Sequence, residues 1–353
     1  MSKRILIMAG GTGGHVFPAL AIADYFEKKN CHIFWLGGVN GLERSLVKIE
    51  PVRMLLIRFS GVRKNGVLRW LFLPFTLVAA CLSTLRFLMR IKPDVVIGFG
   101  GYITVPGAIA AALYRRPIVI HEQNAIPGLA NRLLAKISKK VLLGFPGAIS
   151  KGVFVGNPLR PEFESVKHPE ERYGKRKGRL TVVIVGGSLG SQTFNKVLPL
   201  AISKMPIDLR PNIIHQCGRN NLDELKSLYD QLGIEANLSE FIEDMPDVYS
   251  RADLVISRAG ALTVAEISAV GVASMLIPYP YAVDDHQTKN GEFLEKLGAA
   301  IMVSETEMSP ELIADYLLRT SRDQLMMMAI NAKSGRLEGA TALAGRHIEE
   351  LIL

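Results

Sequence analysis

Two glycine-containing stretches and several polar clusters in this sequence have residue types that could bind phosphate or move a proton. The first is Gly10-Gly11-Thr12-Gly13-Gly14-His15, between the apolar run Arg4–Ile7 and a predicted helix over Ala19–Phe26. Glycines let backbone N–H groups approach an anion, and a helix N-terminus favours phosphate. The imidazole of His15 titrates near neutral pH and can accept a proton. The spacing fits neither a dinucleotide fingerprint nor a P-loop, and a tight turn without ligand is the alternative.

The second stretch runs from Ser257 to Ile267, after an apolar run that ends at Ile256. A helix is predicted to begin near Ala261 and to stop at Gly271. The N–H groups at its start form an anion site. Glu266 lies on its second turn, where a carboxylate can accept hydrogen bonds from both ribose hydroxyls. Together they predict a site for a nucleoside diphosphate, and a surface glutamate is the alternative.

Further polar clusters follow other predicted strands. They are His121-Glu122-Gln123-Asn124, Gly156-Asn157-Pro158-Leu159-Arg160 and the stretch from Asp284 to Asn290. No second ligand set accompanies the adjacent aspartates, so no metal site is predicted, and Asp285 is expected to cap a helix. A third glycine cluster, Gly98-Phe99-Gly100-Gly101-Tyr102, is by itself best explained by close packing of the next helix.

Short apolar runs alternate with segments of helix length along the whole chain, which predicts parallel sheets covered by helices on both faces. In such sheets ligands bind beyond the carboxyl ends of the strands. The predicted strands are Arg4–Ile7, His32–Leu36, Asp94–Ile97, Pro117–Ile120, Val141–Leu143, Leu180–Val185, Ile213–His215, Asp253–Ile256 and Met275–Ile277.

The chain is expected to form two domains, because 353 residues suffice for two cores. Residues 161–179 are polar and aperiodic, which predicts a linker. After them the run Thr181–Val185 leads into Gly186-Gly187-Ser188-Leu189-Gly190-Ser191, which repeats the opening plan of strand, glycine loop and helix. The fold class is therefore α/β with two doubly wound domains.

Charge and cysteine content limit the possible partners and compartment. Residues 1–160 hold 22 Lys and Arg against 6 Asp and Glu, a balance of +16, whereas the remainder holds 20 against 27. This imbalance predicts an anionic partner for the first half, either nucleic acid or an anionic membrane, and a solvated basic face is the alternative. No nucleic-acid motif is present. The three separated cysteines indicate a reducing compartment, and no export signal is predicted.

Residues 68–90 contain an almost unbroken apolar run, Leu71 to Leu82, in which Pro74 is expected in the first helical turn. Arg69 and Arg86 bracket about 16 residues, fewer than the roughly 20 that a membrane-spanning helix needs. The segment is therefore predicted to be a core helix or a helix that touches lipid from one side.

In their order along the chain, these motifs resemble the MurG family of membrane-associated transferases, which add N-acetylglucosamine to a lipid-linked muramyl-pentapeptide. Any one motif is weak, but the ordered set spans nearly the whole chain. The matching residues are Gly10–His15, His121–Asn124, Gly156–Arg160, Gly186–Ser188, Phe241-Ile242, Gly260–Glu266 and His286-Gln287. His286 departs from the family pattern, in which a glutamine is common.

The resemblance implies a glycosyltransferase-B fold with two Rossmann-like domains and an active site in the cleft between them. Residues 1–160, joined by a C-terminal helix at 341–353, would face the acceptor and the membrane, and residues 161–340 would bind the UDP-sugar donor. It further implies that the backbone of Ile242 meets the uracil, Glu266 the ribose, and Ser188 with Ala261, Leu262, Thr263, Val264 and Ala265 the diphosphate region. The sugar end would meet Gln287, Asn124 and Thr12-Gly13-Gly14, and Arg160 would line the cleft.

The implied activity is inverting transfer of N-acetylglucosamine from UDP-N-acetylglucosamine to the C4 hydroxyl of undecaprenyl-diphosphate-N-acetylmuramoyl-pentapeptide, for peptidoglycan synthesis. His15 is the expected general base, with Glu122 as second choice, and neither a metal nor a cofactor is expected. The expected location is the cytoplasmic face of the inner membrane, bound peripherally to anionic lipid, with other cell-wall proteins as further partners. The alternatives are a UDP-sugar epimerase or glycolipid synthase on the same fold, and a non-catalytic nucleotide-sugar-binding scaffold.

Overall fold

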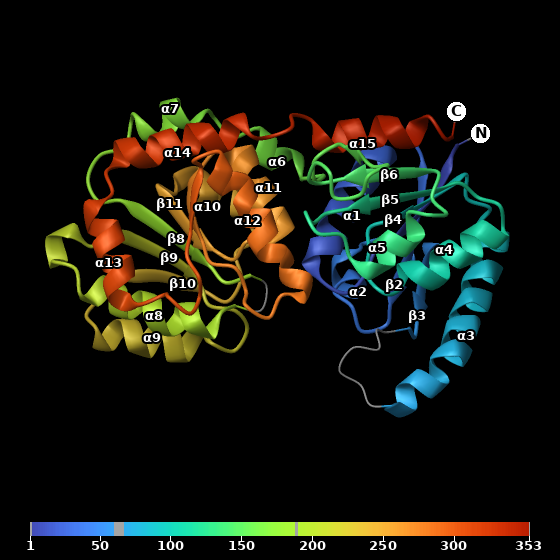
Figure 1. The fold of residues 1–353 in the computed structure, drawn as a ribbon, viewed down its shortest axis with the longest axis horizontal. Coiled ribbons are helices and arrows are strands. Elements are labelled where there is room, and N and C mark those ends of the chain that lie inside the picture. Colours follow the sequence, from blue (N-terminus) through green and yellow to red (C-terminus); the bar gives the residue numbers. More distant parts are fainter. Residues whose placement is uncertain (1, 60–66, 188–189, 353) are drawn as a thin grey trace. The chain divides into compact units, whose positions relative to one another are not determined.

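The computed structural model describes residues 2–59, 67–187 and 190–352, and for residues 67–71 and 283 it describes the backbone only. The chain folds into two compact units (Figure 1). Unit 1 comprises residues 1–160 and 339–353, and unit 2 comprises residues 161–338. The predicted fold class, α/β with two doubly wound parallel-sheet domains, is confirmed.

Unit 1 is built on a parallel sheet of seven strands in the order β3-β2-β1-β4-β5-β6-β7. The central strands are apolar and fully buried because helices cover both faces of the sheet. The strands are β1 Arg4–Met8, β2 His32–Gly38, β3 Met54–Ile57, β4 Val95–Gly98, β5 Ile118–Glu122, β6 Lys140–Leu143 and β7 Val153–Phe154. The helices are α1 Gly13–Glu27, α2 Glu43–Leu46, α3 Val67–Ile91, α4 Thr104–Leu113, α5 Leu129–Leu134 and α15 Ala340–Glu349.

Unit 2 repeats this plan with a parallel sheet of six strands in the order β10-β9-β8-β11-β12-β13. The strands are β8 Thr181–Val185, β9 Asn212–Gln216, β10 Ala236–Ser239, β11 Leu254–Ser257, β12 Ala273–Leu276 and β13 Ala300–Met302. The helices are α6 Pro161–Glu164, α7 Pro169–Tyr173, α8 Gln192–Ser203, α9 Leu222–Gln231, α10 Met245–Arg251, α11 Ala261–Val270, α12 His286–Lys296, α13 Pro310–Arg319 and α14 Arg322–Ser334.

Each sheet reverses its strand order at one point, and this point locates the ligand crevice of a doubly wound fold. In unit 1 the reversal lies between β1 and β4, whose ends carry the glycine loops at residues 9–12 and 99–103. In unit 2 it lies between β8 and β11, which lead into residues 186–191 and 258–260. Within each unit, the topology therefore brings two of the glycine-containing stretches to one edge of the sheet.

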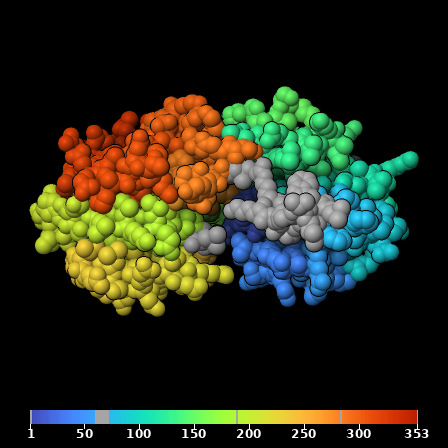
Figure 2. All heavy atoms as spheres, turned by 60° about the horizontal axis from the view of Figure 1, so that its bottom comes forward, coloured from blue at the N-terminus to red at the C-terminus, as the bar shows by residue number. Residues whose placement is uncertain are grey.

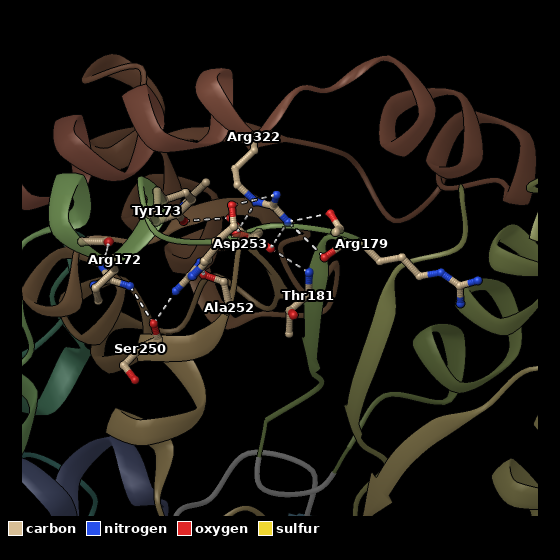
Figure 3. A network of polar contacts seen from close by, with 12 residues as sticks. Arg172, Tyr173, Arg179, Thr181, Ser250, Ala252, Asp253 and Arg322 are labelled. Atoms are coloured by element: carbon tan, nitrogen blue, oxygen red, sulfur yellow. Dashed lines mark hydrogen bonds and ion pairs between the residues drawn. The ribbon is translucent and has the colours of Figure 1, made fainter. Parts of the chain in front are cut away.

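The prediction of a linker over residues 161–179 is wrong. This segment contains α6 and α7, and its side chains are hydrogen-bonded to other residues of unit 2 (Figure 3). Asp253, only 1% exposed, accepts hydrogen bonds from Arg176 Nη1 (2.8 Å) and Arg322 Nε (3.2 Å). Its second oxygen accepts from the N–H of Thr181 (2.8 Å). Arg172 donates to the carbonyl of Ser250 (2.9 Å). Because polar side chains make these contacts, the segment shows no hydrophobic periodicity in the sequence.

Helix α3 begins at Val67, so Pro74 lies inside the helix and not in its first turn as predicted. Phe72–Ile91, a stretch of 20 residues, is long and apolar enough to cross a bilayer by length and composition alone, so the length argument against a spanning helix was wrong. The helix packs on α4, and its atoms (light blue) also form part of the surface in Figure 2. One face is buried, with Ala80, Thr84, Phe87, Leu88 and Ile91. The opposite face exposes Phe72, Phe75, Val78, Leu82 and Met89.

Candidate active site

The glycine loop of unit 1 is shorter than predicted, because α1 begins at Gly13 and not near Ala19. Gly13, Gly14 and His15 therefore form the first helical turn. Thr12 is the N-cap, and its carbonyl accepts a hydrogen bond from the N–H of His15 (3.1 Å). The Thr12 side chain caps no N–H group, so the N–H groups of Gly13 and Gly14 lack an acceptor within the helix. This turn can donate to an anionic or sugar oxygen.

The imidazole of His15 lies against the second glycine loop of unit 1. A Cβ atom on Gly100 would come within 3.1 Å of His15 Cε1, and one on Gly101 within 2.6 Å of the Gly10 carbonyl oxygen. Both glycines have positive φ angles, of 98° and 82°. The cluster at residues 98–102 therefore makes room for His15 and Gly10, in addition to any packing of the following helix.

The environment of His15 keeps its ring neutral at physiological pH. Burial lowers the pKa of His15 to about 4. Nδ1 is buried and has no hydrogen-bond partner among the described residues, so Nε2 is the nitrogen that reaches solvent. A neutral imidazole can accept a proton, although its low pKa makes it a weak base until a substrate changes its surroundings.

His121 and Glu122 lie within β5 and are buried, whereas the sequence placed them after the strand. His121 Nε2 lies 2.9 Å from the carbonyl oxygen of Gly156, and its ring stacks on Phe99 with centroids 5.6 Å apart. Gln123 Nε2 donates to Nδ1 (3.1 Å), so Nε2 carries the proton. His121 therefore connects β5 to Gly156, in the segment that leads from unit 1 into unit 2.

The Glu122 carboxylate is fully engaged with the loop that follows it. Oε1 accepts from the backbone N–H (2.9 Å) and the side-chain amide (3.3 Å) of Asn124. Oε2 accepts from the N–H of Gly128 (3.1 Å) and from Asn131 Nδ2 (2.9 Å). Asn124 itself is half-buried at the end of this turn. The geometry suits a group that shapes the loop better than one that takes a proton.

Arg160, exposed, is the last residue of the first stretch of unit 1. Its neighbour Leu159 donates its N–H to Thr341 Oγ1 (3.1 Å), and this hydroxyl donates back to the Leu159 carbonyl (2.9 Å). Asn157 is buried and donates to the carbonyl of Gln123 (3.1 Å). The segment is thus fixed to α15 and to the loop after β5.

In unit 2, Gly186 and Gly187 follow β8, and Ser191 caps α8 by accepting the N–H of Phe194 (3.3 Å). Gly190 has a φ of 75°, and a Cβ there would come within 2.0 Å of the Cys217 carbonyl oxygen. Close backbone approach thus requires glycine at this position. Ser188, the predicted phosphate contact, lies outside the described residues.

Gln216, at the end of β9, links this loop to Ile242, and no motif in the sequence indicates this role. Its Nε2 donates to the carbonyl of Gly187 (2.8 Å), and its Oε1 accepts the N–H of Ile242 (3.2 Å). Ile242 is buried. Because its N–H is engaged, base recognition through the backbone of Ile242 would use its carbonyl oxygen.

Helix α11 begins at Ala261, as predicted, and ends at Gly271, whose φ of 69° gives a left-handed C-cap. Gly260 is the N-cap, and having no side chain it makes no capping hydrogen bond itself. The first helical bond runs from the Val264 N–H to the Gly260 carbonyl (2.9 Å), so the N–H groups of Leu262 and Thr263 have no acceptor within the helix. Ala265 and Glu266, both half-buried, occupy the second turn.

Gln287 is in the first turn of α12 and is half-buried. Its Oε1 accepts the N–H of Tyr279 (2.9 Å), which leaves its amide nitrogen to donate. His286 is half-buried beside it. Asp285 stands at the N-cap with a φ of 51°, and its Oδ1 accepts from Thr288 Oγ1 (2.7 Å). In the described part of the chain, no three His, Cys, Asp or Glu side chains gather as a metal site.

Arg258 joins the loops at this edge of unit 2, a role that the sequence did not indicate. It donates to Ser191 Oγ (2.9 Å) and to the carbonyl of Ile277 (3.2 Å), and it forms an ion pair with Glu305. Its guanidinium also lies over the Phe194 ring, 4.6 Å from the centroid. The guanidinium is therefore paired within the protein, and its contacts hold α8, β11 and β12 together.

Comparisons with known proteins agree with this geometry. Residues 5–143 match the glycosyltransferase family 28 N-terminal domain, and residues 181–343 match its C-terminal domain. A UDP-N-acetylglucosamine–N-acetylmuramyl-(pentapeptide) pyrophosphoryl-undecaprenol N-acetylglucosamine transferase of Nitrosospira multiformis is 48% identical over 336 residues, 94% of each chain. The same-named protein of Burkholderia mallei is 45% identical over 98% of each chain.

The crystal structure of Acinetobacter baumannii MurG superposes with a TM-score of 0.84 at 38% sequence identity, over 99% of both chains. Identity at this level over nearly the full length covers both units and every predicted site stretch. The chain therefore belongs to the MurG family of N-acetylglucosaminyltransferases, within glycosyltransferase family 28.

Proposed function

We propose that this protein transfers N-acetylglucosamine from UDP-N-acetylglucosamine to the C4 hydroxyl of a polyprenyl-diphosphate-linked muramoyl-pentapeptide, with inversion at the anomeric carbon. Membership of the MurG family supports the two substrates. The observation that carries the proposal is the N-terminus of α11, where the N–H groups of Leu262 and Thr263 have no acceptor within the helix. It lies at the strand-order reversal of unit 2, with Glu266 one turn further on.

The donor's charge matches this helix end. The diphosphate would accept hydrogen bonds from the N–H groups of Leu262 and Thr263, where the helix dipole adds positive potential. Glu266 would accept from the ribose hydroxyls, and the Ile242 carbonyl would accept from the uracil ring N–H. As UDP leaves, its negative charge grows, and preorganised N–H dipoles stabilise the growing charge.

The transfer step needs an acceptor for one proton. The acceptor's C4 oxygen forms a bond to the anomeric carbon, the bond from this carbon to the diphosphate oxygen breaks, and the hydroxyl proton passes to His15 Nε2. His15 suits this role because its ring is neutral and Nε2 is open. Glu122 suits it less, because both its oxygens already accept hydrogen bonds. Asn124, Gln287 and the Thr12–Gly14 turn would hold the sugar.

The test is incubation with labelled UDP-N-acetylglucosamine, with and without a polyprenyl-diphosphate muramoyl-pentapeptide. Label should enter the lipid fraction only when this acceptor is present. Label released as free sugar without acceptor would indicate an epimerase, and label on diacylglycerol a glycolipid synthase. Donor binding without turnover under either condition would indicate a scaffold.

The exposed face of α3 fits peripheral contact with an anionic membrane. Phe75 is 71% and Val78 57% exposed, while the opposite face of the helix is buried in the core of unit 1. A helix with one buried face cannot be surrounded by lipid, so it would lie on the bilayer surface. The +16 balance of residues 1–160 would add electrostatic attraction, roughly 1 kcal/mol for each well-placed Lys or Arg.

Vesicle co-sedimentation tests this contact. Binding to anionic vesicles should exceed binding to neutral ones and weaken with salt. Phe75→Glu with Val78→Glu should reduce it at every salt concentration. The matched control is Ile207→Glu with Leu209→Glu, which removes equally exposed apolar groups from unit 2. Unchanged vesicle binding of the α3 variant would mean that this helix does not contact lipid and serves only the core of unit 1.

A further inference from the structure

Glu43 is a fully buried carboxylate beneath the glycine loop of unit 1, with 0% of its surface exposed. Its Oε2 accepts the N–H of Gly11 (3.1 Å), and its Oε1 accepts the N–H of Gly38 at the end of β2 (2.5 Å). The carboxylate thus joins the loop after β1 to the end of β2. The Gly11 N–H is therefore engaged and does not serve as an anion donor, which corrects the expectation for this glycine.

Glycines surround the carboxylate because it fills the space that their side chains would need. A Cβ atom would come within 2.5 Å of the Glu43 side chain at Gly10, within 2.6 Å at Gly37 and within 2.0 Å at Gly41. These are backbone positions at which any larger residue would displace the carboxylate. The sequence around residues 37–41 thus forms a cradle for this one side chain.

Glu43 acts on the part of the loop that carries His15. Gly11, whose φ is 95°, directly precedes the N-cap Thr12. Its carbonyl accepts the N–H of Leu42 (3.4 Å), so residues 42 and 43 hold both of its polar backbone groups. The Thr12 carbonyl in turn accepts the N–H of His15 (3.1 Å). A shift of Gly11 would therefore move the turn from which the imidazole projects.

Stability alone explains this arrangement poorly. Burying a carboxylate costs free energy that two hydrogen bonds only partly offset, and apolar replacements of buried ionic groups are often neutral or stabilising. Specific placement of a loop is a better-supported use of such a group. Misplacement of a reacting group by about 1 Å can lower a rate by about 100-fold.

We propose that Glu43 is a positioning residue for sugar transfer: its carboxylate sets the place of the Gly10–Thr12 loop and, through it, of His15. This inference rests on the proposed role of His15 as the general base. The residues proposed to bind UDP all belong to unit 2, so Glu43 should affect turnover and leave UDP affinity unchanged.

Glu43→Gln tests the proposal, because glutamine keeps the shape but must turn its NH₂ group toward one of the two N–H donors. We expect kcat to fall by about 10- to 100-fold, with the Kd for UDP within about twofold of wild type. Glu27→Gln, an exposed change at the end of α1, is the matched control and should behave as wild type. Thermal unfolding is followed for each variant.

A double variant separates positioning from general damage. If Glu43 acts through His15, adding Glu43→Gln to His15→Ala should lower kcat by less than about threefold. An equal fall in both backgrounds would overturn the proposal, and so would wild-type kcat in Glu43→Gln with only a lower melting temperature. Should Glu43→Gln not fold, Glu43→Asp keeps both acceptors one carbon shorter, and wild-type kcat in that folded variant would also overturn it. Wild-type turnover in His15→Ala would instead refute the proposed base.

Discussion

Acidification below about pH 6.5 should destabilise unit 1, because His121 is buried in its neutral form. Burial lowers the pKa of His121 to about 4, against 6.5 in the unfolded chain. A group with a lowered folded pKa contributes stability above its unfolded pKa and loses it as the pH falls toward the folded value. The unfolding free energy should thus be nearly flat above pH 7 and decline from about pH 6.5 to 4.

The size of the decline follows from the two pKa values. At pH 5 the unfolded chain binds the proton about 30-fold more favourably than the folded one, which corresponds to about 2 kcal/mol for His121. Burial lowers the pKa of His15 to about 4 as well, so His15 acts in the same direction. In unit 2, His215 shows the same kind of shift, to about 3, and should act in the same direction there.

Urea unfolding followed by tryptophan fluorescence measures this directly, since both tryptophans, Trp35 and Trp70, belong to unit 1. The unfolding free energy should fall by at least about 2 kcal/mol between pH 7 and pH 5. In His121→Gln, whose absolute stability is lower, this pH-dependent loss should shrink by about 2 kcal/mol. The reasoning fails if wild-type stability is the same at both pH values, or if His121→Gln shows the wild-type decline.

The remaining predictions concern the site. His15→Ala should lower kcat by roughly 10²–10⁴ with donor affinity unchanged, and a fall in kcat of less than tenfold would reassign the base. Wild-type kcat/KM should fall with acid only as the pH approaches 4, where His15 becomes protonated. Glu122→Gln should lower the unfolding free energy by about 2–5 kcal/mol, because the hydrogen-bond donors of residues 124–131 lose a charged acceptor. The folded fraction of this variant should keep turnover above the His15→Ala level. Complete loss of turnover in a fully folded Glu122→Gln variant would restore Glu122 as the base. Glu305→Gln should loosen Arg258 and raise the Kd for UDP, measured by calorimetry, by about threefold or more, and an unchanged Kd would contradict the bracing role.

The parts of the fold that the sequence predicted are those with local signals. Central strands such as β1 and β11 are continuous apolar runs because both faces are buried, and α11 has a glycine at each end. The strands that sequence reasoning missed are β3, β7, β10 and β13, which are short and only partly buried. Their apolar signal is therefore interrupted.

The contacts that were missed in the site join residues far apart in the chain. Glu43 meets Gly11 across 32 positions, and Gln216 meets Ile242 across 26. The imidazole of His15 packs against Gly100, a glycine for which the sequence predicted only close packing of the next helix. Such pairs leave no spacing pattern, because the sheet order, not the local sequence, brings them together. Motif order indicated which stretches matter but not what each side chain contacts.

Calorimetric titration of UDP into Glu266→Ala tests whether the donor binds at α11. The matched control is Glu295→Ala, which removes an exposed carboxylate from the neighbouring helix α12. We expect Glu266→Ala to lose about 1.5–3 kcal/mol of UDP binding free energy, the value of hydrogen bonds to a charged group, and the control to lose none. Equal UDP affinity in wild type, Glu266→Ala and Glu295→Ala would contradict this expectation.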